Sequence, residues 1–152
     1  MIEQPLHHDD LYHHSLLRKE LSTPICLDES IKSIFDAEAG YALGSYRIIN
    51  IKPARISGLN ETLKIHGFAK EHGIPLWIGG VLETGIGRAF QIATAALPMI
   101  KYPTISRNPI ASTGKTLSSH PGDSAVMEHN DVPNKPGIGV GVKIDTIITI
   151  KL

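Results

Sequence analysis

The stretch Arg47-Ile48-Ile49-Asn50-Ile51-Lys52-Pro53-Ala54-Arg55-Ile56-Ser57-Gly58 decides the fold of this chain. Its first half is a β-branched run that is too short for a helix and is stopped by a proline, so it predicts a buried parallel strand. Because side chains alternate between the two faces of a strand, Ile48, Asn50 and Lys52 should share one face. That face ends in two polar residues, so we expect it to border a cavity. The alternative is a strand-end lysine whose ammonium simply reaches solvent.

Composition sets the broad class. The 152 residues include 41% hydrophobic residues, enough for one domain with a core. The formal charge is zero and the pI is about 7.1, so neither a nucleic-acid footprint nor a basic membrane patch is visible. Cys26 is the only cysteine, which excludes an internal disulfide. We therefore expect a cytoplasmic protein with neither nucleic acid nor membrane as a partner.

Hydrophobic runs and turn residues predict alternating strands and helices. The expected strands are Met1–Glu3, Ile25–Asp28, Arg47–Lys52 and Ile74–Ile78, with a further one around Ile100–Ile105. The first expected helix is capped by Asp9 and Asp10, and the second begins at Ser30 and stops at Gly44. Two more helices are expected over 58–72 and 85–97. The second helix should bury Ile31, Ile34, Phe35, Ala39 and Leu43, and the third Leu59, Leu63, Ile65, His66 and Ala69.

The strands recur at an even spacing. Markers at Ile2, Cys26, Ile51, Trp77 and Tyr102 are separated by 24, 25, 26 and 25 residues. A repeat of one strand and one helix predicts right-handed βαβ units on a parallel sheet. An open doubly wound sheet and a (β/α)8 barrel both satisfy this pattern, and the even period favours the barrel.

Polar side chains stand at the carboxyl ends of successive strands. Glu3, Asp28 and Lys52 end three of them, and in a barrel these ends face one mouth, where chemistry takes place. Two carboxylates suit Mg²⁺, which prefers oxygen ligands and can stabilise the enediolate formed when an α-proton leaves. A neighbouring lysine is a natural base, because a cation and partial burial lower its pKa. The alternative is that each residue only caps a strand or pairs with a neighbour.

Four motifs carry a family resemblance. Ile2-Glu3-Gln4-Pro5, Leu27-Asp28-Glu29-Ser30, Asn50-Ile51-Lys52-Pro53 and the run 77–89 (WIGGVLETGIGRA) resemble the barrel domain of the enolase superfamily. Within it the chain is most similar to the muconate-lactonising subgroup, in particular to o-succinylbenzoate synthases and N-acylamino-acid racemases. The resemblance implies an α/β fold that is part of a TIM (β/α)8 barrel, roughly strands 4 to 8 with their helices. Residues 1–109 would be the C-terminal part of the enolase-type barrel, and residues 110–152 an irregular segment and closing strand.

The resemblance also implies an activity. It predicts a Mg²⁺-dependent lyase or racemase that abstracts an α-proton from a small carboxylate substrate. Glu3 and Asp28 match the metal ligands and Lys52 matches the acid/base lysine. Gly80 and Val81 would lie beside the side chain of the substrate. We also expect Asn50 to contact the substrate, because it shares a strand face with Lys52.

Family members are more than twice as long as this chain. Their third carboxylate ligand and their Lys-x-Lys motif have no counterpart in these 152 residues. We therefore expect a C-terminal fragment, and a partial barrel with open strand edges should depend on the missing half or form a homo-oligomer. The alternative function is a noncatalytic remnant that folds only with a partner.

Two other groups of residues admit two interpretations. His7, His8, His13 and His14 bracket Asp9 and Asp10, which suggests zinc, but a polar cluster on a solvent-facing helix is the interpretation we favour. Arg55 and Arg88 could hold a substrate carboxylate or pair with neighbouring acids, and we favour pairing.

Overall fold

The computed structural model describes residues 1–103, 118–119, 132 and 135–145. The chain divides into two compact units, Met1–Gly79 with Leu97–Thr104, and Gly80–Ala96 with Ile105–Leu152. Among the described residues, no helix has the length and apolar character needed to cross a membrane.

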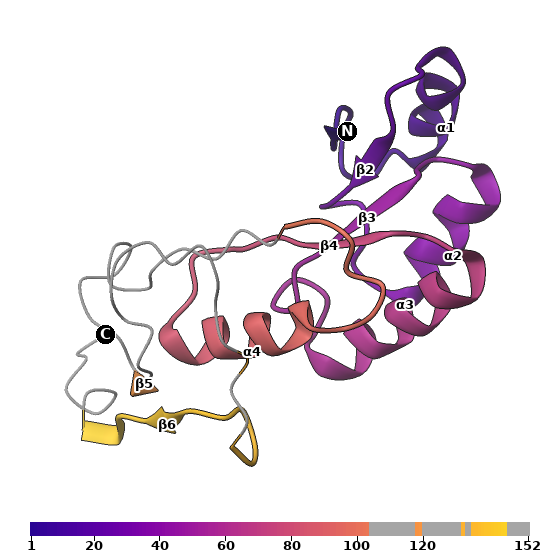
Figure 1. The fold of residues 1–152 in the computed structure, drawn as a ribbon. Helices are drawn as coiled ribbons and strands as arrows, with labels where there is room; N and C mark the ends of the chain where they lie inside the picture. The colour runs from indigo at the N-terminus through magenta and orange to yellow at the C-terminus, as the bar shows by residue number, and fades with distance from the viewer. Residues whose placement is uncertain (104–117, 120–131, 133–134, 146–152) are drawn as a thin grey trace. The chain divides into compact units, whose positions relative to one another are not determined.

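The first unit is built on a parallel sheet of four strands (Figure 1). The strands are β1 (Ile2–Glu3), β2 (Ile25–Leu27), β3 (Ile48–Ile51) and β4 (Leu76–Ile78). They lie in the order β1-β2-β3-β4, and every neighbouring pair is parallel. This is a single sweep in chain order, as in a barrel, whereas a doubly wound sheet reverses its strand order. The predicted α/β fold with a parallel sheet is therefore confirmed.

Three helices connect these strands on one side of the sheet (Figure 1). They are α1 (Leu11–Glu20), α2 (Ile34–Leu43) and α3 (Leu59–His72). One strand face is fully buried and entirely aliphatic, and it consists of Ile25, Leu27, Ile49, Ile51, Leu76 and Ile78. Burial of each such side chain stabilises the fold by about 1.5–3 kcal/mol. The opposite face carries a smaller cluster of Cys26, Ile48 and Trp77, against which Tyr102 packs.

Local sequence fixes most of the helix ends. Asp10 caps α1 by accepting a hydrogen bond from the backbone N–H of His13 at 2.8 Å. Gly44 and Gly73 end α2 and α3 with φ angles of 75° and 64°, in the left-handed region that glycine adopts without a Cβ penalty. The helix stops expected at these two glycines are confirmed.

The predicted start and buried stripe of α2 were wrong. The N-cap is Ser33, because the hydroxyl of Ser30 accepts a hydrogen bond from the side chain of Gln4 at 2.7 Å instead. The buried residues of α2 are Ala37 and Gly40. A Cβ on Gly40 would lie 2.8 Å from the ring of Tyr46, so only a small residue allows this approach.

Several of the larger side chains of the expected stripes lie at the surface. On α2, Phe35 and Leu43 are 76% and 47% exposed and Ala39 is exposed as well, whereas Ile31 is buried as expected. On α3, Ile65 and Ala69 are buried as expected, but Leu59 and Leu63 are 48% and 45% exposed.

The fifth expected strand, Ile100–Ile105, is reduced within the described residues to one parallel bridge between Leu76 and Ile100. Its last two residues lie outside the described part of the chain. So do most of the expected irregular segment, 110–134, and the expected closing strand, 147–152.

The second unit contains α4 (Gly85–Ala95) and a two-stranded antiparallel sheet of β5 (Ser118–Ser119) and β6 (Gly141–Val142). Thr84 caps α4, because its side chain accepts a hydrogen bond from the backbone N–H of Gly87. The helix expected over 85–97 is thus present and ends two residues early.

Candidate active site

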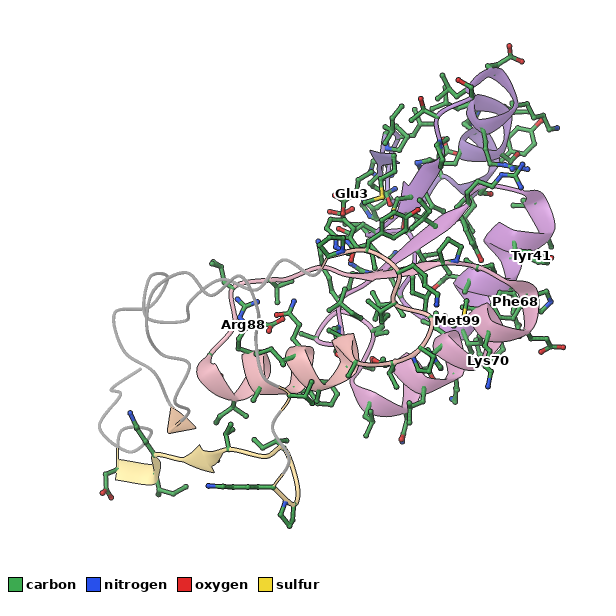
Figure 2. All side chains as sticks on the ribbon, in the orientation of Figure 1. Glu3, Tyr41, Phe68, Lys70, Arg88 and Met99 are labelled. Carbon is green, nitrogen blue, oxygen red and sulfur yellow. The ribbon has the colours of Figure 1, made fainter. Side chains whose placement is uncertain are left out.

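The carboxyl ends of β1, β2 and β3 border one open cleft of about 590 Å³. Glu3, Asp28 and Lys52 all line it, although 49 residues separate the first from the last in sequence. Figure 2 shows Glu3 among the strands of the first unit, whereas the labelled Tyr41 and Phe68 lie on its helices. The structure therefore brings together the three residues that the sequence predicted to share a rim.

Asp28 is the electrostatic centre of this cleft. Its side chain is only 3% exposed, and its two carboxylate oxygens form separate ion pairs with Lys52 Nζ and with the guanidinium of Arg55. A buried carboxylate needs such partners, because its desolvation would otherwise cost several kcal/mol. The ion pair predicted for Arg55 is confirmed.

Arg55 also holds the backbone around the site. It donates to the carbonyl of Ile31 at 3.1 Å and to the carbonyl of Asn50 at 2.7 Å. These bonds tie the loop after β2 to the end of β3. Two backbone carbonyls therefore hold the guanidinium that contacts Asp28, whereas Lys52 contacts Asp28 through the end of a flexible side chain.

Asn50 links two parts of the rim. Its side chain is fully buried, and Nδ2 donates to Glu3 Oε1 at 2.6 Å while Oδ1 accepts from the backbone N–H of Gly79 at 2.7 Å. Both ends of the amide thus hold protein groups in place. The substrate contact expected for Asn50 stays a prediction, and the role that this geometry supports is orientation of Glu3.

Gly79 is required by this arrangement. A Cβ at this position would lie 2.5 Å and 2.6 Å from the amide atoms of Asn50 and 2.8 Å from Lys52 Cε. Real Cβ atoms essentially never come so close to other heavy atoms. The first glycine of the Gly79-Gly80 pair therefore leaves room for the side chains of Asn50 and Lys52.

Gln4 is a site residue that our reading of the sequence did not single out. Its Oε1 accepts hydrogen bonds from the backbone N–H groups of Asp28 at 2.9 Å and Ser30 at 3.2 Å. Its backbone φ is 39°, in the left-handed region, which is strained for a residue with a Cβ. Gln4 stands inside the quoted Glu-Gln-Pro motif, and that motif was the one available signal.

The thiol beneath the rim is inert. Burial raises the pKa of Cys26 to about 12, and the negative charges of Glu3 and Asp28 act in the same direction. The thiol therefore stays protonated near neutral pH and offers no thiolate nucleophile.

The remaining site candidates belong to the second unit. Gly80 is half-buried and Val81 is 38% exposed, and the substrate contacts expected for both stay predictions. Burial raises the pKa of Glu83, an effect that the nearby Arg88 charge partly offsets. Arg88 also donates to Gln91 Oε1.

The histidine-rich segment does not form the single solvent-facing cluster that we expected. His14 is fully buried, where Nε2 accepts from the backbone N–H of Leu6 at 3.2 Å and Nδ1 meets the carbonyl of Asp10. This histidine belongs to the core, because its two ring nitrogens satisfy backbone groups at the start of α1. His13 pairs with the Asp10 carboxylate at 2.7 Å, and His7 and His8 lie on the mouth of the cleft.

A parallel sheet with polar strand ends around one cleft is the arrangement found in α/β barrel domains, and comparison with known families identifies the class. The model of the family described as enolase C-terminal domain-like matches residues 1–146, so this chain belongs to that family. The resemblance to the enolase superfamily is confirmed.

Particular relatives are similar to this chain over nearly its whole length. An o-succinylbenzoate synthase of Bacillus subtilis is 46% identical over 95% of the chain, and an N-succinylamino acid racemase of Thermus thermophilus is 41% identical over 99%. A solved member of the enolase superfamily from Enterococcus faecalis superposes with a TM-score of 0.87 at 37% identity, over 97% of the chain and 40% of that structure. The chain spans only 39% and 41% of the lengths of the first two relatives.

Proposed function

We propose that this chain carries the proton-abstracting half of a Mg²⁺-dependent lyase or racemase acting on a small carboxylate, of the o-succinylbenzoate synthase or N-acylamino-acid racemase type. The observation that carries the proposal is the meeting of Lys52 Nζ and the Asp28 carboxylate in a cleft that Glu3 also lines. Relatives named o-succinylbenzoate synthase and N-succinylamino acid racemase support both reaction types.

The donor set of the cleft fits magnesium. Glu3 and Asp28 would hold the ion, since both offer carboxylate oxygens and Mg²⁺ is commonly bound through one or two carboxylates together with waters. When bound, the metal would supply charge stabilisation for the enediolate form of the substrate. Asn50 would orient one of these ligands, because its side-chain amide donates a hydrogen bond to the Glu3 carboxylate.

Lys52 is the proposed acid/base group. For Asp28 to serve as a ligand, Lys52 has to leave the Asp28 oxygen that it contacts, while Arg55 can keep its contact on the other oxygen. The Lys52 ammonium released in this way has to give up a proton to solvent, and the neutral amine that results can then take the α-proton of a substrate bound in the cleft. Gly80 and Val81 are proposed to contact the side chain of that substrate.

The order of the strands supports an assignment of β1 to β4 to particular strands of a barrel. We propose that β1 to β4 are strands 4 to 7 of a (β/α)8 barrel, and that further polypeptide or self-association completes the barrel. A noncatalytic protein that folds only with a partner is the second candidate, and the occupation of both Asp28 oxygens by Lys52 and Arg55 favours it.

Exchange of the substrate α-proton for deuterium in D₂O, followed by NMR with an N-succinylamino acid and Mg²⁺, tests this proposal directly. We expect exchange when the chain is co-expressed with the N-terminal remainder of the Bacillus subtilis relative, and its loss in Lys52→Ala. Lys70→Ala, which removes an exposed lysine on α3, is the matched control and should exchange like the parent. Equal exchange in Lys52→Ala would refute the assignment of the base. Absence of exchange in a well-folded complex would favour the noncatalytic remnant.

A further inference from the structure

A group of metal-ligating side chains lies in the loop between β1 and α1, apart from Glu3 and Asp28. His7, His8 and Asp9 each offer one ligand atom, and these atoms lie within 4.8 Å of one another. We propose that these three residues bind a divalent transition-metal ion of the zinc class at the mouth of the cleft. The site is distinct from the carboxylate pair in the proposed function, because it is rich in nitrogen ligands.

The internal contacts of the cluster already bring its ligands together. The rings of His7 and His8 have centroids 4.1 Å apart, and His8 Nε2 lies 3.2 Å from Asp9 Oδ2. The backbone N–H of Asp9 donates to His7 Nδ1 at 3.3 Å. All three side chains are therefore gathered around one point by local contacts, although each is exposed.

Small movements would complete the coordination. Zinc takes nitrogen and oxygen ligands at about 2.0–2.2 Å, so tetrahedral ligands stand roughly 3.3 Å apart. The ligand atoms lie within 4.8 Å of one another, so they need to approach by at most about 1.5 Å, which rotamer changes of exposed side chains can supply. Water would fill the fourth position, as in zinc sites that keep an open coordination place.

Ligand chemistry distinguishes this site from the Glu3 and Asp28 pair. Imidazole suits zinc, copper and nickel, whereas carboxylate and water suit magnesium. Lys32 Nζ lies 2.8 Å from Asp9 Oδ1 and leaves Oδ2 on the histidine side.

The surrounding charges have opposing effects on a cation. Glu3 and Glu29 line the same cleft as His7 and His8 and attract cations, whereas the charge of Asp28 is already offset by Lys52 and Arg55. Lys32 repels cations, because its ammonium pairs with the Asp9 carboxylate. If the three residues bind zinc, removal of the Lys32 charge should therefore increase the affinity for zinc. A histidine cluster that is only solvated would show no such increase.

Isothermal titration of the 152-residue chain with Zn²⁺, in the absence of Mg²⁺ and substrate, tests the proposal. We expect one equivalent bound in the micromolar range, and a loss of at least about tenfold in the double variant His7→Ala, His8→Ala. His72→Ala, which removes an exposed histidine on α3, is the matched control and should bind like the parent. Circular dichroism checks that each variant keeps its helices.

Two further variants distinguish zinc bound at His7, His8 and Asp9 from zinc bound among the carboxylates of the cleft. Lys32→Gln should tighten Zn²⁺ binding about two- to fivefold, because it removes the opposing charge. Glu3→Gln should leave the affinity within about threefold, and a larger loss would place the zinc among the carboxylates and overturn the proposal. The absence of saturable binding to the parent, or equal binding by the double histidine variant, would overturn it as well. None of these measurements uses enzymatic activity, so they are independent of the proposed reaction.

Discussion

Replacing Gly79 by alanine should damage the candidate active site from within. Gly79 directly follows β4, and its backbone N–H donates a hydrogen bond to Asn50 Oδ1 at 2.7 Å. An added methyl carbon would lie 2.5 Å and 2.6 Å from the two amide atoms of Asn50, and 2.8 Å from Lys52 Cε. Lys52 Cε belongs to a flexible side chain and can move, but Asn50 is fully buried between Glu3 and Gly79.

The cost can be worked out from these contacts. Extra methyl groups in a well-packed interior usually cost about 1–3 kcal/mol. Displacement of Asn50 would also weaken its bonds to Glu3 and to the Gly79 backbone, each worth about 1 kcal/mol net. We therefore expect Gly79→Ala to lower the free energy of unfolding by about 2–5 kcal/mol, which combines both effects.

Urea-induced unfolding measures this change, with the fluorescence of the single tryptophan, Trp77, as the probe. The matched control is Gly67→Ala, because Gly67 lies inside α3 and a Cβ there meets no atom within 4 Å. Alanine in a helix interior should raise stability by about 0.5–1 kcal/mol relative to glycine. The reasoning is refuted if Gly79→Ala unfolds at the same urea concentration as the parent while the control behaves as expected.

Three other substitutions test the separate roles of Lys52 and Arg55 beside Asp28 and the pKa shift of Cys26. Lys52→Met should change the free energy of unfolding by less than about 1 kcal/mol, because Arg55 still neutralises Asp28. Arg55→Met should cost about 3 kcal/mol, since it also leaves two backbone carbonyls without their donor; equal losses in urea unfolding for the two variants would contradict this division. The pKa of Cys26 is raised by burial to about 12 in the folded state, above the value of about 8.5 in an unfolded chain. Its contribution to stability is therefore complete below pH 8.5 or so and is lost as the pH rises toward 12. Urea unfolding at pH 8, 10 and 11 should show a steeper decline for the parent than for Cys26→Ala, and parallel declines would argue against the shift.

Much of the fold could be predicted because its signals are local. The aliphatic run Ile48–Ile51, the capping Asp10 and the glycines at 44 and 73 each act within a few residues of their own position. The even strand spacing alone predicts that Glu3, Asp28 and Lys52 share one rim, where the structure has them. The buried stripes were predicted less well. Hydrophobicity alone could not show that Tyr46 needs the space at Gly40 and leaves Phe35 in solvent.

The partners of the site residues could not be predicted, because they join distant parts of the chain. Gln4 hydrogen-bonds to Asp28 and Ser30, which are 24 and 26 residues away. Asn50 reaches Glu3 across 47 residues and Gly79 across 29. The same limit applies to His14, which has no sequence feature that separates it from the exposed His13.

The sequence by itself determined the order of strands and helices, the family, and the residue types available at the strand ends, since these depend on short-range patterns and motifs. Only the tertiary structure decided which of those residues hold one another. It assigned Arg55 and Lys52 to the two oxygens of Asp28, and it required a glycine at position 79 beside Asn50. The physical reason is that hydrogen bonds and steric contacts depend on distances of a few ångströms, which the sequence sets only once the strands are paired.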